Sequence, residues 1–300
     1  MSRGGRACLD YARLYPDDDI RGYVPFVGVN NSSDKDPALM QFLYEEIGDE
    51  VYGEERAAEI RQTIRDFQTE LFRSKDILAP QLWEPAGQSG MRYFENVNES
   101  SFFDMSVFEF VPGFWMSGGD IKTLEDTLEM PEETEQEKTE KLNEELMALM
   151  IFGDASSYSY DSGAWSYYLC GLKGEGVYST DFRWIRESLE TAGLSEKLGI
   201  SEEEEADFLR HFVLSEEQRK ISSFTPGHFE ALDSWAKTTD KYIIFIGGNL
   251  DPWSSVYIDG GDNPHFHTYI LSGSSHQTKI GQFDREIQNE IIEIMKSWLP

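Results

Sequence analysis

Positive charge is scarce in this sequence: 26 Lys and Arg residues stand against 56 Asp and Glu residues, which gives a formal net charge of −30 at pH 7. A surface this acidic repels phosphate groups, so we expect neither nucleic acid nor a membrane surface among the partners. Long apolar runs are lacking too. None approaches the ~20 residues of a membrane-spanning helix, and the first residues do not form the basic and apolar pattern of a signal peptide.

Cysteine is also rare, and the two that are present, Cys8 and Cys170, have no spacing typical of metal ligands. We expect two buried free thiols, with a single disulfide as the alternative, so cysteine usage does not indicate the compartment. Apolar residues nevertheless make up 39% of the chain and aromatic residues 13%, which is enough for a hydrophobic core. The 300 residues suit one large domain or two modest ones.

The two ends of the chain alternate strands with helices, whereas the middle is helical. Residues 6–15 predict a helix and residues 22–29 a buried strand that contains one unfavourable residue, Pro25. Between residues 31 and 225, apolar residues recur at helical spacing, as Ile60, Ile64, Phe67 and Leu71 do. The C-terminal region predicts, in order, a helix over 226–236, strands over 241–247 and 267–271, and an amphipathic helix over 283–299. We therefore expect an α/β layer interrupted by a large helical insertion.

Three residues with catalytic potential lie at the ends of predicted elements. Asp251 and His276 each follow one of the two C-terminal strands, and Ser2 directly precedes the first helix. Functional residues of open α/β sheets lie just past the carboxyl ends of strands. A serine becomes a nucleophile when an imidazole takes its proton, and a carboxylate holds that imidazole in the required tautomer. The order Ser, Asp, His is that of the α/β-hydrolase triad.

The residues after Ser2 fit a sharp turn that leads into a helix. The backbone N–H that follows a nucleophile meets the oxyanion, and here it belongs to Arg3. Gly4 and Gly5 have no side chain, so we expect them to let the helix approach the rest of the molecule closely after a strained turn.

Each candidate also has a purely structural interpretation. For Ser2, the alternative is the second residue of a frayed terminus. For Asp251, it is a turn, because Asp before Pro252 is a common turn pair. For His276, it is a surface or core residue, as any one of the 5 His residues more often is. His265 and His267 have no acid or thiol partner at ligand spacing, so we predict no metal site. The occurrence of three suitable residue types in the right order favours the catalytic interpretation.

Several segments resemble bacterial serine prolyl/tripeptidyl aminopeptidases, which are α/β-hydrolase exopeptidases with a large helical cap. They are Ser2–Gly5, Tyr15–Asp18, Gly22–Val27, Ser106–Trp115, Asn249–Ser254 and Gly273–His276. The similarity is specific at the two ends of the chain and weak through the cap. It implies that Ser2 is the nucleophile, Asp251 the orienting acid and His276 the base, with no cofactor and no metal.

The resemblance also implies an organisation of the chain. Residues 1–30 would form the nucleophile elbow, helix and strand of the hydrolase core. Residues 31–225 would form a mostly helical cap, and residues 226–300 would return to the core with the acid and the base. The implied activity is that of a serine exopeptidase that releases tripeptides or prolyl units from peptide N-termini through an acyl-enzyme.

Three further residues are candidates for binding short peptide substrates. Glu109 lies in the cap segment in which an acid precedes a Phe-Trp pair, and it is a candidate for the site of the substrate's α-amino group. A helix-cap or salt-bridge acid is its structural alternative. Trp115 in the same segment and Trp253 beside the predicted acid are the other two candidates.

The sequence departs from this family before Ser2, where only Met1 stands. The strands that precede the elbow, its leading Gly and the loop with the second oxyanion donor are not in it, so we expect a partial sheet with an open edge and a reading frame that starts internally. The alternatives are an inert fragment, a fragment that associates with the N-terminal half of the hydrolase domain, an esterase with the same triad, and an N-terminal nucleophile exposed by removal of Met1. This chain does not indicate a compartment, although the resemblance implies a secreted or periplasmic full-length form.

Overall fold

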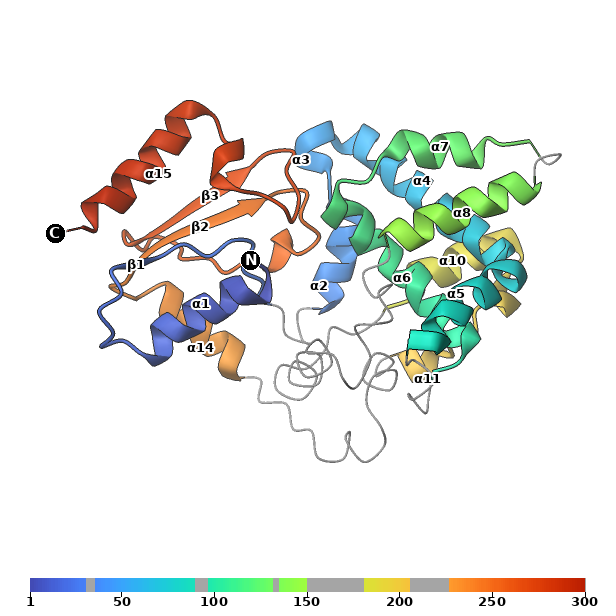
Figure 1. Cartoon of the computed structure of the whole chain (residues 1–300), viewed down its shortest axis with the longest axis horizontal. Coiled ribbons are helices and arrows are strands. Elements are labelled where there is room, and N and C mark those ends of the chain that lie inside the picture. Colours follow the sequence, from blue (N-terminus) through green and yellow to red (C-terminus); the bar gives the residue numbers. More distant parts are fainter. Residues whose placement is uncertain (31–35, 90–96, 132–134, 150–180, 206–226, 300) are drawn as a thin grey trace.

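Figure 1 shows a sheet flanked by helices and, beside it, a block of helices, in a computed structural model that describes residues 1–30, 36–89, 97–131, 135–149, 181–205 and 227–299. Both ends of the chain build the sheet part, and residues between them build the helical block. This mixture of helices with a small parallel sheet is that of an α/β fold. None of the helices in these ranges is long and apolar enough to cross a membrane.

The sheet contains three parallel strands within the described residues, in the order β1-β2-β3. The central strand β2 (Tyr242–Gly248) pairs with β3 (Phe266–Leu271), with Gly248 opposite Leu271 at the end of the register. After Tyr242, every residue of β2 is buried, as expected for a run of β-branched and aromatic residues in the middle of a parallel sheet. Both strands end at the same edge, so the loops that follow them meet there.

The first strand, β1 (Gly22–Tyr23), is shorter than the strand predicted over residues 22–29. After β1, the chain remains hydrogen-bonded to β2 but no longer forms a regular strand. The Ile246 N–H donates to the Pro25 carbonyl at 3.0 Å, and the Val27 N–H donates to the Ile246 carbonyl at 2.8 Å. Regular extended backbone ends here because Pro25 has no N–H to donate and because Val27 has a left-handed φ of 44°.

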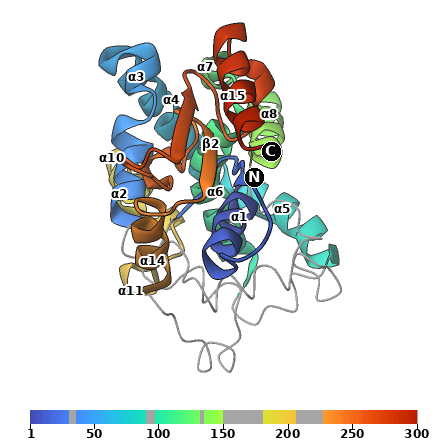
Figure 2. The same cartoon turned by 90° about the vertical axis from the view of Figure 1, so that its left-hand side faces the viewer.

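Helices cover both faces of the sheet, as Figures 1 and 2 show. α1 (Arg3–Leu14) and α14 (Gly227–Ala236) pack on the face that carries Ile243 and Phe245. α15 (Arg285–Ser297) packs on the opposite face, because alternate residues of a strand point to opposite sides. The apolar stripe predicted for the last helix is confirmed, and it consists of the buried Ile291 with Ile287, Ile294, Met295 and Trp298 packed beside it.

The first helix starts earlier than predicted, at Arg3 rather than at residue 6. Leu9 and Ala12 are fully buried against the sheet, so this helix is part of the core and not a frayed end. Cys8 is a free thiol that is half-buried on the same helix. Cys170 lies outside the described residues, and so does any pairing between the two cysteines.

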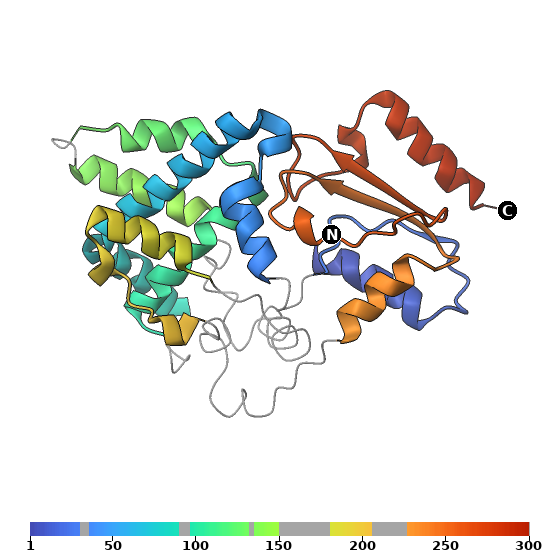
Figure 3. The ribbon, with the colours of Figure 1, turned by 180° about the vertical axis from the view of Figure 1, so that it is seen from behind.

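The helical block, seen from behind in Figure 3, has its own hydrophobic core. The stripe of α4 predicted from residues 60, 64, 67 and 71 is confirmed, since all four side chains are buried. The described elements of the block are α2 (Asp36–Gln41), the π-helical turn η1 (Phe42–Glu46), α3 (Asp49–Tyr52), α4 (Glu54–Arg73), α5 (Lys75–Ser89), α6 (Glu99–Ser117), α7 (Ile121–Leu128), α8 (Glu135–Leu149), α10 (Arg183–Ala192), the 3₁₀ turn η5 (Ser195–Lys197) and α11 (Glu202–Glu205).

The central helix of the block is α6, which is buried continuously from Phe102 to Trp115. A capping box between Asn98 and Ser101 fixes its start, because each side chain accepts a hydrogen bond from the backbone N–H of the other. A helix that is buried on all sides belongs in the middle of a helical layer. The block reaches the sheet part through Leu250 and Val256, which lie just after β2 and belong to the same hydrophobic core.

Candidate active site

Asp251 and His276 form a buried pair at the carboxyl edge of the sheet. The Asp251 side chain is fully buried and the His276 side chain is 8% exposed, and Asp251 Oδ2 lies 2.7 Å from His276 Nδ1. Asp251 also accepts a hydrogen bond from the Trp253 N–H at 2.9 Å, through Oδ1. A carboxylate only accepts hydrogen bonds, so the proton of the neutral imidazole lies on Nδ1 and Nε2 is left as a base.

Close contact between two loops brings the pair together. The Leu250 N–H donates to the Ser274 carbonyl at 3.0 Å, and the Gly273 N–H donates to the Asn249 side chain at 2.9 Å. Gly248 is required where the loops cross, because a Cβ atom there would lie 2.2 Å from the Ser274 carbonyl oxygen. The loops after β2 and β3 are therefore locked to each other, and Asp251 and His276 are held between them.

Tyr257 is a third member of this cluster, and sequence reasoning missed it. Its hydroxyl donates to Asp251 Oδ2 at 2.5 Å, so this oxygen receives hydrogen bonds from both Tyr257 and His276. Burial and the negative charge of Asp251 raise the pKa of Tyr257 far above its ordinary value, so the hydroxyl stays protonated. No local pattern distinguishes Tyr257 from any other half-buried aromatic residue near a turn.

Ser2 occupies a strained turn at the start of α1. Its φ and ψ are 56° and −132°, and together with Val27 it is one of two non-glycine residues with a positive φ in the described ranges. Such conformations cost free energy and gather at functional sites. The Ser2 N–H donates to the Phe26 carbonyl at 3.0 Å, which attaches the turn to the chain segment beside β2.

The helix after this turn packs tightly on the same segment. A Cβ atom at Gly5 would lie 2.6 Å from the Phe26 carbonyl oxygen, so the expected close approach exists at Gly5. Gly4 differs from the expectation, because a Cβ atom there would meet nothing within 4 Å. Arg3 is the first residue of α1, and its N–H is among those that have no intrahelical acceptor.

The structure does not join the serine to the Asp251–His276 pair directly. In the described residues, no hydrogen bond links the half-buried Ser2 hydroxyl to His276 or caps α1. Figure 1 shows the N-terminal end of α1 beside the carboxyl edge of the sheet, between the sheet and the helical block. The turn and the pair thus lie in the same region of the molecule.

The three candidate substrate-binding residues lie in two different places. Trp253 is half-buried, and its ring centre is 5.0 Å from that of His276. Glu109 and Trp115 are buried inside the helical block on α6, with exposed fractions of 0% and 3%. The Trp115 ring packs close to Gly48, where a Cβ atom would lie 3.4 Å from Trp115 Cη2. Substrate binding by these residues stays a prediction.

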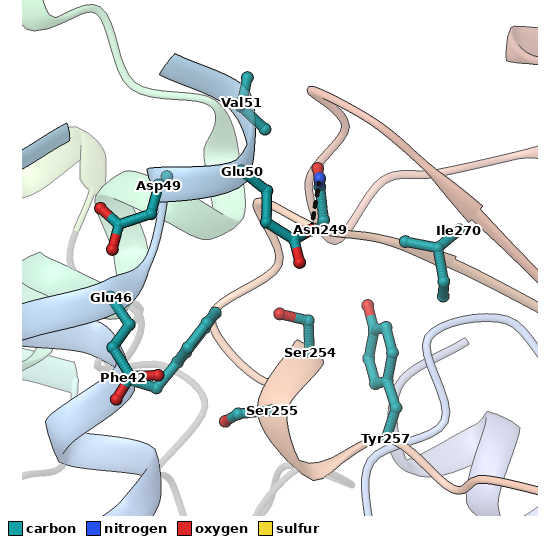
Figure 4. Close-up of a pocket in the computed structure, with 11 residues that line it drawn as sticks. Phe42, Glu46, Asp49, Glu50, Val51, Asn249, Ser254, Ser255, Tyr257 and Ile270 are labelled. Atoms are coloured by element: carbon teal, nitrogen blue, oxygen red, sulfur yellow. Dashed lines mark hydrogen bonds between the residues drawn. The ribbon is translucent and has the colours of Figure 1, made fainter. Parts of the chain in front are cut away.

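A pocket of about 400 Å³ lies where the helical block meets the loop after β2, as Figure 4 shows. Tyr257 forms part of its wall, so the pocket adjoins the Asp251–His276–Tyr257 cluster. Three carboxylates line the opposite wall. Asp49 is paired with Arg61 at 2.7 Å, Glu50 accepts a hydrogen bond from Asn249 at 3.3 Å, and Glu46 is exposed. The remaining lining residues are Phe42, Gly48, Val51, Ser254, Ser255 and Ile270.

Comparison with curated proteins finds a relative, the prolyl tri/tetrapeptidyl aminopeptidase of Streptomyces mobaraensis, which is 20% identical over 285 residues. The alignment covers 94% of this chain and 53% of the relative, so the chain spans about half the length of the relative. No family model and no solved structure matches. At this level of identity the similarity supports a peptidase-type hydrolase and nothing finer.

Proposed function

We propose that this chain carries the catalytic triad of a serine exopeptidase that releases tripeptides or prolyl units from the N-termini of short peptides. Ser2 is the nucleophile, His276 the general base, Asp251 the acid that orients His276, and the Arg3 N–H an oxyanion donor. The observation that carries the proposal is the buried 2.7 Å contact between Asp251 and His276 at the carboxyl edge of the sheet. The strained turn at Ser2 and the aminopeptidase relative support it.

The proposed reaction proceeds through an acyl-enzyme. His276 Nε2 takes the proton of the Ser2 hydroxyl as Oγ attacks the scissile carbonyl carbon, and the oxyanion is met by the Arg3 N–H at the positive end of α1. The imidazolium, stabilised by Asp251, then gives its proton to the leaving amine. Water then attacks the ester carbonyl as His276 Nε2 takes one of its protons, and this proton passes to Ser2 Oγ as the ester bond breaks and the peptide acid leaves. The step requires Ser2 Oγ to come within hydrogen-bond reach of Nε2, a contact that often tightens only when substrate binds.

The same proposal includes the assignment of the fold to an α/β-hydrolase core and a cap. We propose an α/β-hydrolase core formed by residues 1–30 and 226–300, with residues 31–225 as a cap. The three-stranded parallel sheet and the helical described parts of the middle region support this division.

A fluorophosphonate probe tests the proposed nucleophile. Such a probe reacts with a serine that is activated by a base, so we expect one label per folded chain, located at Ser2 by peptide mapping. Ser2→Ala should remove the label. Ser234→Ala is the matched control, because Ser234 is an exposed serine on α14 and should leave labelling unchanged. A folded chain that takes up no label would favour the inert-fragment alternative. A separate assay compares short acyl esters with peptide amides as substrates, and faster turnover of the esters would favour an esterase.

The acidic pocket suggests where a free peptide amino group lies. We expect Glu50→Gln to raise KM for a peptide with a free N-terminus about two- to five-fold, the effect of losing one exposed ion pair. The same peptide with an acetylated N-terminus should show no change, because it carries no charge there. Glu54→Gln is the matched control, since Glu54 is an exposed acid nearby that does not line the pocket. An equal rise in KM for both peptides would contradict this assignment.

A further inference from the structure

The Tyr257 hydroxyl bonds directly to the oxygen atom through which Asp251 contacts His276. The two contacts to Asp251 Oδ2 are 2.5 Å from Tyr257 and 2.7 Å from His276. The carboxylate is fully buried, so solvent does not reach it and these donors with the Trp253 N–H stabilise its charge. The hydroxyl therefore competes with the imidazole for the negative charge on a single atom.

The ring of Tyr257 has a separate, structural role. Its centre lies 5.0 Å from the centre of the Phe245 ring, and it packs over Gly247, where a Cβ atom would lie 2.4 Å from Tyr257 Cε2. Replacement of Tyr257 by Phe keeps this packing and removes only the hydroxyl. The contribution of the hydrogen bond is therefore open to measurement apart from the contribution of the ring.

We propose that Tyr257 is a positioning residue that acts on His276 through Asp251, by fixing the carboxylate and by withdrawing part of its charge from the imidazole. This inference rests on the proposed function. The hydroxyl of Tyr257 donates its proton to the hydrogen bond without giving it up. With the hydroxyl in place, the carboxylate stabilises a protonated His276 less strongly than it would alone.

Other charged groups near the cluster come from the opposite wall of the pocket. Glu46 of η1 and Asp49 and Glu50 of α3 line that wall, and Asn249 donates a hydrogen bond to Glu50. Asp49 is neutralised by its ion pair with Arg61, so Glu46 and Glu50 are the acids that add negative charge to the pocket. They remain unchanged when Tyr257 is replaced. A shift in the titration of His276 on loss of the hydroxyl therefore reports on the bond to Asp251 and not on these acids.

The test is an NMR titration of the His276 ring, identified by comparison with His276→Gln, in the wild-type chain and in Tyr257→Phe. We expect the midpoint to move upward by about 0.5 to 1 pH unit, because a hydrogen bond to a charged group is lost and part of its effect reaches the imidazole. The acid limb of the pH profile of kcat/KM should move in the same direction. We also expect kcat to fall about ten-fold with little change in KM, because orientation is lost and binding is not.

Three comparisons keep the outcome decisive. Tyr44→Phe, a change at another buried tyrosine that lies in the helical block, should leave the midpoint in place. Replacement of Asp251 by Asn should remove the effect of Tyr257→Phe, whereas a steric effect would persist. If Tyr257→Phe does not fold, the titration is made on Tyr257→Met, which also lacks the hydroxyl.

The failures of the two proposals are distinguishable because the titration requires no turnover. An unchanged midpoint in folded Tyr257→Phe would overturn the role of Tyr257, whatever the activity of the chain. A shifted midpoint in a chain that neither reacts with fluorophosphonate nor cleaves peptides would support that role and contradict the proposed peptidase.

Discussion

Ser2→Ala is expected to lower kcat for peptide hydrolysis about 10⁶-fold, because no other group in the proposed triad replaces the lost nucleophile. His276→Ala should cost about the same, since a serine without its base is a poor nucleophile. Asp251→Asn should lower kcat about 10⁴-fold, because the amide favours the wrong tautomer of His276 while it keeps the size of the side chain. Steady-state kinetics with a tripeptidyl amide substrate measures all three effects.

The double variant Ser2→Ala/His276→Ala distinguishes a triad from three independent residues. Residues that act as a unit are not additive, so the double variant should be no slower than either single variant. Ser234→Ala, an exposed serine on α14, should keep the wild-type rate. Undiminished hydrolysis by Ser2→Ala would refute Ser2 as the nucleophile.

The second large effect concerns stability and a buried ion pair inside the helical block. Lys75 Nζ lies 2.5 Å from Asp104 Oδ1 and also donates to the Lys197 carbonyl at 2.8 Å. The other carboxylate oxygen accepts a hydrogen bond from the Gly199 N–H at 2.8 Å. The Asp104 side chain is fully buried and that of Lys75 is 9% exposed. The pair therefore joins α5 and α6 to the end of η5 and to Gly199 just after it.

Lys75→Met is expected to lower the free energy of unfolding by about 3–5 kcal/mol, because it leaves the Asp104 carboxylate buried without its cation. Urea denaturation followed by circular dichroism measures the loss. The double variant Lys75→Met/Asp104→Leu should recover most of it, since it removes both charges together. A single variant that costs less than about 1 kcal/mol would show that the pair is no more important than an exposed one.

Periodic apolar residues were sufficient to predict the elements at the two ends of the chain and the helical character of its middle. The run of β-branched residues before Gly248 forms the central strand, and the stripes that include Phe67 on α4 and Ile291 on α15 are buried as predicted. These patterns are informative because each of them reports which face of an element is shielded from water. The length of β1 was less predictable, because it depends on the backbone conformation at Val27.

The candidate site was predictable only in part. Asp251 and His276 were identified because each follows a strand, and parallel strands end at the same edge of a sheet. Tyr257 and the acids of the pocket were missed, because they reach the site through side-chain contacts that no local spacing encodes. The ion pair of Lys75 with Asp104 was missed for the same reason, since its members lie on different helices.

The sequence by itself determined the acidic charge, the strand–helix alternation at the two ends of the chain, the helical middle and the residue types available for catalysis. Only the tertiary structure decided that Asp251 is buried between His276 and Tyr257, and that the pocket beside them is lined by acids from η1 and α3. The physical reason is that hydrophobic periodicity describes one element at a time, whereas a site depends on how several elements pack around one buried charge.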